Sequence, residues 1–246
     1  MSVYLILGAS SDLGVELINS LEAQKDDEKK IYLAHYNTSK EKLEKIQLHN
    51  GNQLVCIQAD LSSYESVENL INIIKKYTDA PTHIVHLAAP SFKYMRLKDF
   101  NHTSLIKSIN IQVVSIARIL QEFLPIMAKR KAHNKIVIML TSYLLHTPPK
   151  YVMEYAIVKS ALLGLMRALA ADYLGKGVNI NALSPSMIET KFLSNLDERI
   201  VQNVAENSPE QRNAVPKDIV PVIKFLLSDA SNYLHGANLN VTNGGG

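Results

Sequence analysis

The 246-residue sequence contains a single cysteine, which excludes an internal disulfide framework, so its stability must come from a hydrophobic core. Ten glycines and nine prolines are too few for a collagen-like or low-complexity chain. A charge excess of one sign is also lacking, because 26 basic residues against 23 acidic ones leave a net charge of only +3. The first apolar run, residues 3–7, is too short for a signal peptide or a membrane span. We therefore expect a cytoplasmic protein with no nucleic-acid or membrane partner.

A content of 47% hydrophobic and 20% charged residues is typical of a globular chain. The length fits one α/β unit, so we predict a single domain over residues 1–246. Short apolar runs alternate with longer amphipathic segments, which predicts an α/β fold, a doubly wound parallel sheet with helices on both faces. The expected strands are 3–7, 31–35, 54–57, 83–88, 136–140 and 178–182, and the expected helices are 13–23, 67–77, 106–127 and 151–174.

The first strand runs into a turn of small residues that precedes a helix. Gly8 permits a tight turn, and Ser10 and Ser11 let backbone N–H groups approach a pyrophosphate. Gly14 lets the helix pack closely on the strand. The alternative is a plain strand-to-helix turn that needs two glycines. The position of this turn, after the first strand of a chain in which strands and helices alternate, favours a dinucleotide-binding site.

The segment after the second strand bears on the type of dinucleotide. A site selective for NAD usually carries a carboxylate there, which binds the ribose 2′-hydroxyl. No Asp or Glu occurs between Ile31 and Lys40, while Asn37, Thr38 and Lys40 offer hydrogen-bond donors. We therefore predict a preference for NADP, with NAD possible. After the third strand, Asp60 is either an acceptor for the adenine amino group or a cap of the following helix.

Three residues near the fifth strand form a candidate reacting group. Ser142 follows the strand, Tyr155 lies thirteen residues later, and Lys159 is one helical turn beyond, on the same face as Tyr155. A phenol has an ordinary pKa of about 10, and we expect the lysine ammonium and a positive nicotinamide ring to lower it toward the working range. Ser142 would hold the substrate oxygen while Tyr155 moves the proton. The alternative is an ordinary pair on a helix surface.

With these residues the chain resembles the short-chain dehydrogenase/reductase family over essentially its whole length. The resemblance implies a seven-stranded Rossmann-type sheet and a catalytic tetrad of Asn110, Ser142, Tyr155 and Lys159, in which the asparagine holds a water of the proton relay. It also implies a 3-oxoacyl-[acyl-carrier-protein]-reductase-like branch and a homotetramer or homodimer formed through helices 106–127 and 151–174. The matching segments are 8–14, 60–61, 181–185, 188–190 and 236–241. The implied cofactor-binding residues are Gly8, Ser10, Ser11, Asp12, Leu13, Gly14, Asn37, Thr38, Asp60, Leu61, Ala88, Tyr155, Lys159, Pro185, Ile188 and Thr190.

The chain departs from the family pattern at several positions. Asp12 stands where the family has the middle glycine of the turn, so a carboxylate lies near the expected pyrophosphate. It either caps the first helix and points away, or it weakens cofactor binding. Leu7 replaces the usual threonine, Ser186 replaces a glycine, and residues 86–89 replace the motif Asn-Asn-Ala-Gly.

These residues predict an NAD(P)H-dependent oxidoreductase that interconverts a carbonyl and a secondary alcohol. Its substrate would be a 3-oxoacyl thioester or another ketone, with a sugar or sugar nucleotide as an alternative. A third hypothesis is a catalytically idle dinucleotide-binding scaffold, because of Asp12 and residues 86–89. The histidines lack metal-ligand spacing, so we expect no metal. Loops 90–101, 144–152 and 192–215 are expected to select the substrate.

Overall fold

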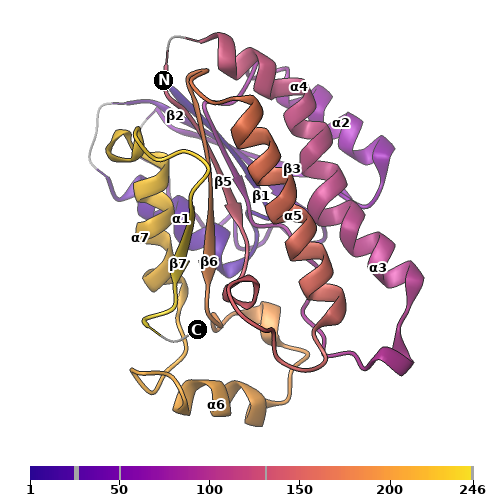
Figure 1. Cartoon of the computed structure of the whole chain (residues 1–246). Helices are drawn as coiled ribbons and strands as arrows, with labels where there is room; N and C mark the ends of the chain where they lie inside the picture. Colours follow the sequence, from indigo (N-terminus) through magenta and orange to yellow (C-terminus); the bar gives the residue numbers. More distant parts are fainter. Residues whose placement is uncertain (25–27, 50, 131, 245–246) are drawn as a thin grey trace.

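The computed structural model describes residues 1–24, 28–49, 51–130 and 132–244. Its strands form one seven-stranded sheet in the order β3-β2-β1-β4-β5-β6-β7 (Figure 1). Every adjacent pair is parallel, which confirms the predicted doubly wound α/β fold. The strands are β1 Ser2–Leu7, β2 Lys30–Tyr36, β3 Gln53–Gln58, β4 His83–His86, β5 Asn134–Met139, β6 Val178–Pro185 and β7 Asn238–Val241.

The order of the strands reverses at β1, which pairs with β2 on one side and with β4 on the other. In a doubly wound sheet this reversal opens a crevice at the carboxyl ends of the strands, where ligands bind. Leu7 at the end of β1 is in register with His86 at the end of β4. The loops that follow these strands therefore enter the same crevice.

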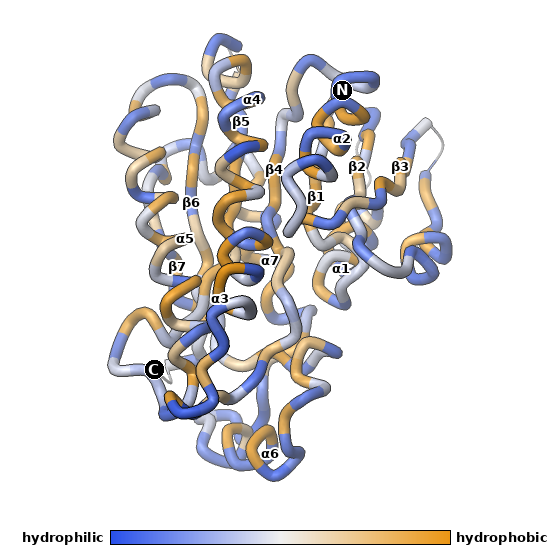
Figure 2. Tube along the Cα trace, turned by 90° about the vertical axis from the view of Figure 1, so that its right-hand side faces the viewer, coloured by the Kyte–Doolittle hydropathy of each residue, from blue (hydrophilic) through white to orange (hydrophobic). Residues whose placement is uncertain are grey.

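Helices cover both faces of the sheet, as Figure 1 shows. Helices α1 (Asp12–Glu22) and α7 (Pro216–Leu227) pack on one face, where Leu17, Ile18 and Ile223 are buried. Helices α2 (Tyr64–Ile74), α4 (Ser115–Lys129) and α5 (Met153–Asp172) cover the other, where Phe123 and Met166 are buried. Hydrophobic segments of the tube in Figure 2 lie in the strands and along these helices. Helix α6 (Glu198–Glu206) lies beyond the carboxyl ends of the strands, at the bottom of Figure 1.

The helix expected over residues 106–127 is longer and is interrupted. It begins with α3 (His102–Ile109), passes through a π-helical turn at Asn110–Val114 and continues as α4. A π-helical turn inserts an extra residue into the helix and often marks a functional site. The helix predicted there is therefore present but begins at His102, and sequence periodicity does not register the extra residue of its π-helical turn. From His102 to Lys129 the combined helix is long and apolar enough to cross a membrane, but its buried residues belong to the core.

The predicted boundaries of the remaining elements shift by a few residues. Helix α2 begins at Tyr64 rather than at residue 67, and Ser63 caps it. Strand β6 continues to Pro185, beyond the predicted end at residue 182, because it pairs with β7 along that stretch. Strand β4 ends at His86 instead of residue 88.

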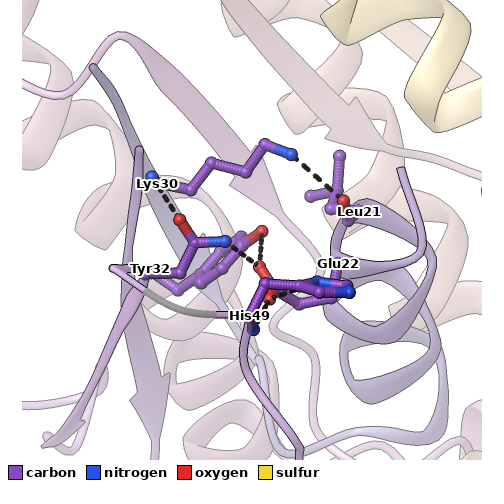
Figure 3. A network of polar contacts seen from close by, with 6 residues as sticks. Leu21, Glu22, Lys30, Tyr32 and His49 are labelled. Carbon is purple, nitrogen blue, oxygen red and sulfur yellow. Dashed lines mark hydrogen bonds and ion pairs between the residues drawn. The ribbon is translucent and has the colours of Figure 1, made fainter. Parts of the chain in front are cut away.

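A cluster of polar side chains ties α1 to β2 at the amino ends of the strands, opposite the crevice (Figure 3). We call Glu22, Lys30, Tyr32, His49 and Asn52 the Glu22 cluster. The buried Glu22 carboxylate accepts hydrogen bonds from the Tyr32 hydroxyl at 2.6 Å, from the Asn52 amide at 2.9 Å and from the His49 backbone at 2.7 Å. Burial favours the neutral carboxyl group, but these bonds together outweigh it, and the pKa of Glu22 lies below its ordinary value.

Candidate active site

A cavity of about 420 Å³ lies at the carboxyl ends of the strands. Its volume is within the usual range for small-molecule sites. It is continuous from the turn after β1 to the start of α5, so the groups expected to bind phosphate and the groups expected to react line one space. Of the residues predicted from the sequence, those that line it are Ser10, Ser11, Asp12, Leu13, Thr38, Tyr155, Lys159, Pro185, Ile188 and Thr190.

The turn after β1 has the geometry that its glycines predict. Gly8 has φ +84°, and a Cβ atom there would lie 2.8 Å from the backbone nitrogen of Ala88, so only glycine fits. Ser11 caps α1, because its hydroxyl accepts from the Gly14 backbone at 3.1 Å and donates to the Gly8 carbonyl at 2.7 Å. The amino end of α1 therefore faces the cavity, because Asp12 and Leu13 of its first turn line it. Gly14 packs against Ala9, where a Cβ atom would clash at 2.5 Å.

The buried side chain of His35 holds this turn in place. The Gly8 backbone donates to Nδ1 of His35 at 3.0 Å, so Nε2 carries the proton and donates to the Ala59 carbonyl at 3.0 Å. Burial lowers the pKa of His35 and keeps the ring neutral. His35 thus joins the ends of β1, β2 and β3, and both of its ring nitrogens are hydrogen-bonded.

Asp12 does not cap α1, since Ser11 does. Its carboxylate forms an ion pair with Lys42 and accepts a hydrogen bond from the Lys191 backbone at 2.8 Å. Burial disfavours the charge, but Lys42 and the Lys191 N–H group outweigh this and lower the pKa of Asp12. Asp12 therefore joins the segments that follow β1, β2 and β6 across the cavity.

The segment after β2 contributes a different lysine from the one predicted. Lys40 is paired with Glu44 at 2.8 Å and does not line the cavity, whereas Lys42 does. Asn37 is exposed and also lies outside the lining. Asp60 is exposed and accepts from the Ser62 backbone and hydroxyl at 2.9 and 2.7 Å, an interaction that lowers its pKa. Of the two roles open to Asp60, capping α2 is wrong, because Ser63 caps that helix. Leu61 is buried in the core.

Tyr155 and Lys159 lie together in the cavity, as their helical spacing predicts. The ammonium of Lys159 lies 5.8 Å from the centre of the Tyr155 ring and donates to the Met139 carbonyl at 2.9 Å. Burial lowers the pKa of Lys159 to about 7. Burial raises the pKa of Tyr155 to about 12, although the Thr141 hydroxyl bonded to its oxygen opposes the shift. The expected lowering of this pKa is thus wrong for the protein without cofactor, because desolvation dominates.

The hydroxyl that meets the Tyr155 phenol belongs to Thr141. Thr141 is buried at the end of β5 and lines the cavity. Ser142 begins the short 3-10 helix Ser142–Leu144 and is not among the lining residues. Both hydroxyls follow the same strand, and the sequence pattern selected only Ser142.

Asn110 and His86 are not among the residues that line the cavity, whereas Leu87 and Ala89 are. Asn110 begins the π-helical turn, and its carbonyl accepts from the Ser115 backbone. His86 is buried, and its Nε2 is bonded to the Gln112 carbonyl at 2.9 Å. Burial lowers the pKa of His86 to about 3. The side chains of His86 and Gln112 each retain a buried polar atom for which the structure shows no hydrogen-bond partner, at Nδ1 and Oε1.

Aromatic rings surround the Tyr155 phenol, and sequence reasoning missed them. Phe92 meets Tyr155 edge-to-face with ring centres 4.9 Å apart, and Tyr143 does so at 6.2 Å. Phe192 is tilted toward it at 6.4 Å. Phe92 and Phe192, which follow β4 and β6, lie in two of the loops expected to select the substrate. Tyr143, which follows β5, directly precedes the third of these loops. Their convergence depends on tertiary structure, so no local pattern signals it.

The arrangement combines a helix start that can bind phosphate with a phenol and a lysine that can move a proton. It fits a dinucleotide, with one departure, the carboxylate of Asp12 in the cavity wall. Among residues 1–24, 28–49, 51–130 and 132–244, no His, Cys, Asp and Glu side chains form a group that could hold a metal ion.

Known proteins are similar to this chain in sequence and in fold. A family model described as Enoyl-(Acyl carrier protein) reductase matches residues 21–245. The uncharacterized oxidoreductase YmfI of Bacillus subtilis is 26% identical over 244 residues, which are 98% of this chain and 97% of that protein. NADPH-dependent aldehyde reductase 2, chloroplastic, of Arabidopsis thaliana is 25% identical over 201 residues, 78% of this chain and 71% of that protein. The crystal structure of levodione reductase has a TM-score of 0.85 at 23% identity and covers 99% of this chain and 96% of that one.

The match of the family model covers most of the chain, and the sequence motifs sit at the carboxyl ends of a sheet with the expected strand order. The protein therefore belongs to the short-chain dehydrogenase/reductase family and is an NAD(P)-dependent oxidoreductase.

Proposed function

We propose that the protein is an NADP-preferring reductase of apolar carbonyl compounds, in which Tyr155 moves the proton. The observation that supports this most directly is the convergence of the phenol of Tyr155 and the ammonium of Lys159 in the cavity that also contains the first turn of α1. A catalytically idle scaffold would have no need to keep a buried lysine beside a phenol.

Reduction adds two electrons and two protons to the carbonyl group. The nicotinamide, when bound, supplies a hydride to the carbonyl carbon. The Tyr155 phenol donates a proton to the carbonyl oxygen, and its raised pKa keeps the phenol protonated at neutral pH. A hydroxyl of Thr141 or Ser142 orients the same oxygen. Lys159, with a pKa of about 7, exchanges protons readily near neutrality and is suited to reload Tyr155, with Asn110 as the expected link to solvent.

The preference for NADP is supported by charge near the end of β2. Lys42 lines the cavity there, together with the hydroxyls of Thr38 and Ser39, and these groups suit a 2′-phosphate, whereas the Glu41 carboxylate of the same wall opposes it. The matched Arabidopsis thaliana protein is named for its use of NADPH. Fluorescence titration is expected to give tighter binding of NADPH than NADH, and Thr38→Asp, which places a carboxylate in the cavity lining, should reverse the order. A preference of the unmodified protein for NADH would contradict this proposal.

The walls around Tyr155 favour an apolar substrate over a sugar. Phe92, Phe192 and Met187 line the cavity, and the first two present rings to Tyr155. A polyhydroxylated sugar would bury hydroxyl groups against these rings without partners, which costs about 1–3 kcal/mol for each group. Ketones with an acyl chain or an aliphatic ring would instead gain from the contact.

We further propose a homodimer or homotetramer that buries the outer faces of α3, α4 and α5. Ile106, Val114 and Ile157 are large apolar side chains exposed on these helices and the π-helical turn between them. Light scattering of the purified protein at several concentrations tests this, and a monomer throughout would contradict it.

The decisive experiment measures turnover of aliphatic ketones, aldehydes, acyl thioesters and keto-sugars with NADPH and with NADH. We expect the highest kcat/KM for an apolar carbonyl with NADPH. Turnover of keto-sugars alone would favour the sugar-reductase alternative. Tight dinucleotide binding without reduction of any compound would favour the scaffold.

A further inference from the structure

Asp12 occupies an unusual place for a carboxylate. It lies in the first turn of α1, in the wall of the cavity, where an approaching phosphate would meet backbone N–H groups. A carboxylate and a phosphate are both anions that accept hydrogen bonds from the same kinds of donor. Two anions therefore compete for this end of the cavity.

The partners of Asp12 are the groups that a phosphate would use. One carboxylate oxygen pairs with the ammonium of Lys42, and the other accepts from the Lys191 backbone at 2.8 Å. Both partners line the same cavity as Asp12. The side chains of Lys42 and Asp12 are 35% and 28% exposed, so their attraction is only partly weakened by solvent.

The bridge also spans the cavity from wall to wall. Lys42 follows β2, Asp12 follows β1, and Lys191 begins the 3-10 helix Lys191–Leu193 after β6. A dinucleotide that extends from the end of β2 to Tyr155 must pass the first turn of α1, where this bridge lies.

We propose that the Asp12 carboxylate is an internal competitor for the phosphate groups of the dinucleotide, holding Lys42 and the Lys191 N–H group until a phosphate displaces it. This inference rests on the proposed function, because it requires a dinucleotide to bind. It makes cofactor binding an exchange of anions. Lys42 leaves Asp12 and pairs with a phosphate, and the segment at Lys191 is released from α1 at the same time.

The proposed exchange predicts in which direction a substitution of Asp12 changes cofactor affinity, and a different role for Asp12 predicts another direction. If the bridge instead closed over a bound cofactor, removing the Asp12 charge would weaken binding. If Asp12 competes, Asp12→Asn keeps the side-chain shape, frees Lys42 and tightens binding of both NADPH and NADH. We expect about a three- to tenfold lower dissociation constant, the range for one partly exposed charge pair. The gain should shrink as salt is raised, because salt screens these charges.

The lysine supplies a second test with a matched control. Lys42→Met removes the cation and leaves Asp12 beside the phosphates, so affinity should fall by about tenfold or more. Lys40→Met removes the same charge two residues away, from a lysine paired with Glu44 outside the cavity, and should change affinity less than about twofold. Glu41→Gln is the control for Asp12, since it removes an exposed carboxylate from the same cavity wall.

The experiment is a fluorescence titration of each folded variant with NADPH and NADH at low and high salt, with thermal unfolding as the check on folding. Tighter binding by Asp12→Asn and a smaller gain from Glu41→Gln support the inference, and Asp12→Gly should repeat the result of Asp12→Asn. Weaker or unchanged binding by both Asp12 variants overturns it, as does an equal gain from Glu41→Gln. Failure of the unmodified protein and of every variant to bind either dinucleotide overturns the proposed function as well.

Discussion

Two polar clusters lie at opposite ends of the same sheet and are built in opposite ways. In the Glu22 cluster, at the amino ends of the strands, the buried carboxylate has hydrogen-bond donors on both oxygens. At the carboxyl ends, Lys159 is buried with a hydrogen bond to one carbonyl, and His86 and Gln112 each keep an unpaired polar atom.

The difference shows what each end contributes. A buried charge with a full set of donors stabilises the fold, and its pKa moves toward the charged form, as that of Glu22 does. A buried charge with few partners destabilises the fold, and its pKa moves toward the neutral form, as that of Lys159 does. Buried groups whose pKa values are shifted in this way are typical of functional sites. We therefore infer that the amino end contributes stability, and we propose that the carboxyl end contributes the chemistry.

The largest effect that separates the two ends is expected for Tyr155→Phe. This change removes the proton donor and keeps the ring against Phe92, so turnover should fall by about 10²–10⁴-fold while cofactor affinity and thermal unfolding stay the same. Steady-state kinetics and calorimetry measure both properties. Tyr151→Phe, at an exposed tyrosine nearby, is the control. Unchanged turnover by Tyr155→Phe would show that this end has no chemical role.

Glu22→Ala is expected to lower stability without changing cofactor binding. Removing this carboxylate takes one acceptor from the buried Tyr32 hydroxyl and from the half-buried Asn52 amide, which should lower the free energy of unfolding by about 2–3 kcal/mol. The dissociation constant of NADPH should not change. Denaturant unfolding and fluorescence titration test the two parts, with the exposed Glu65→Ala as a control. A loss of cofactor affinity without a loss of stability would contradict the comparison.

The third prediction concerns the pH dependence of stability. Lys159 has a pKa of about 7 in the folded protein and an ordinary value of 10.5, so between these values the unfolded chain binds more protons. The free energy of unfolding should therefore rise from pH 7 to pH 9, by at most about 1.4 kcal/mol per pH unit from this group. Lys159→Met should remove that part of the rise. The lowered pKa values of Lys135 and Lys224 act in the same direction and remain in the variant. An unchanged pH dependence of the free energy of unfolding in Lys159→Met would show that burial does not lower the pKa of this lysine.

The smallest effect distinguishes the two hydroxyls at the end of β5. Because Thr141 bonds to the Tyr155 oxygen and lines the cavity, Thr141→Val should lower kcat by about five- to tenfold. Ser142→Ala should lower it less. Both variants should bind NADPH as the unmodified protein does. A larger effect of Ser142→Ala would return the role to the residue that the family pattern indicates.

The sequence by itself was sufficient for the features that depend on neighbours along the chain. Apolar runs and helical periodicity predicted the sheet and its helices, since burial on two faces or on one face leaves a local pattern. The spacing of Tyr155 and Lys159 placed them on one helical face, and the small residues from Gly8 to Gly14 predicted the turn.

Only the tertiary structure decided which groups meet across long stretches of the chain. Asp12 bonds to Lys191, 179 residues away, and no local pattern could indicate whether its carboxylate faced the cavity or the solvent. The aromatic rings around Tyr155 converge from separate loops, and Glu22 receives its donors from β2 and the segments that precede β3. These contacts depend on how the strands are ordered in the sheet, because loops far apart in sequence become neighbours only when parallel strands bring their ends to the same edge.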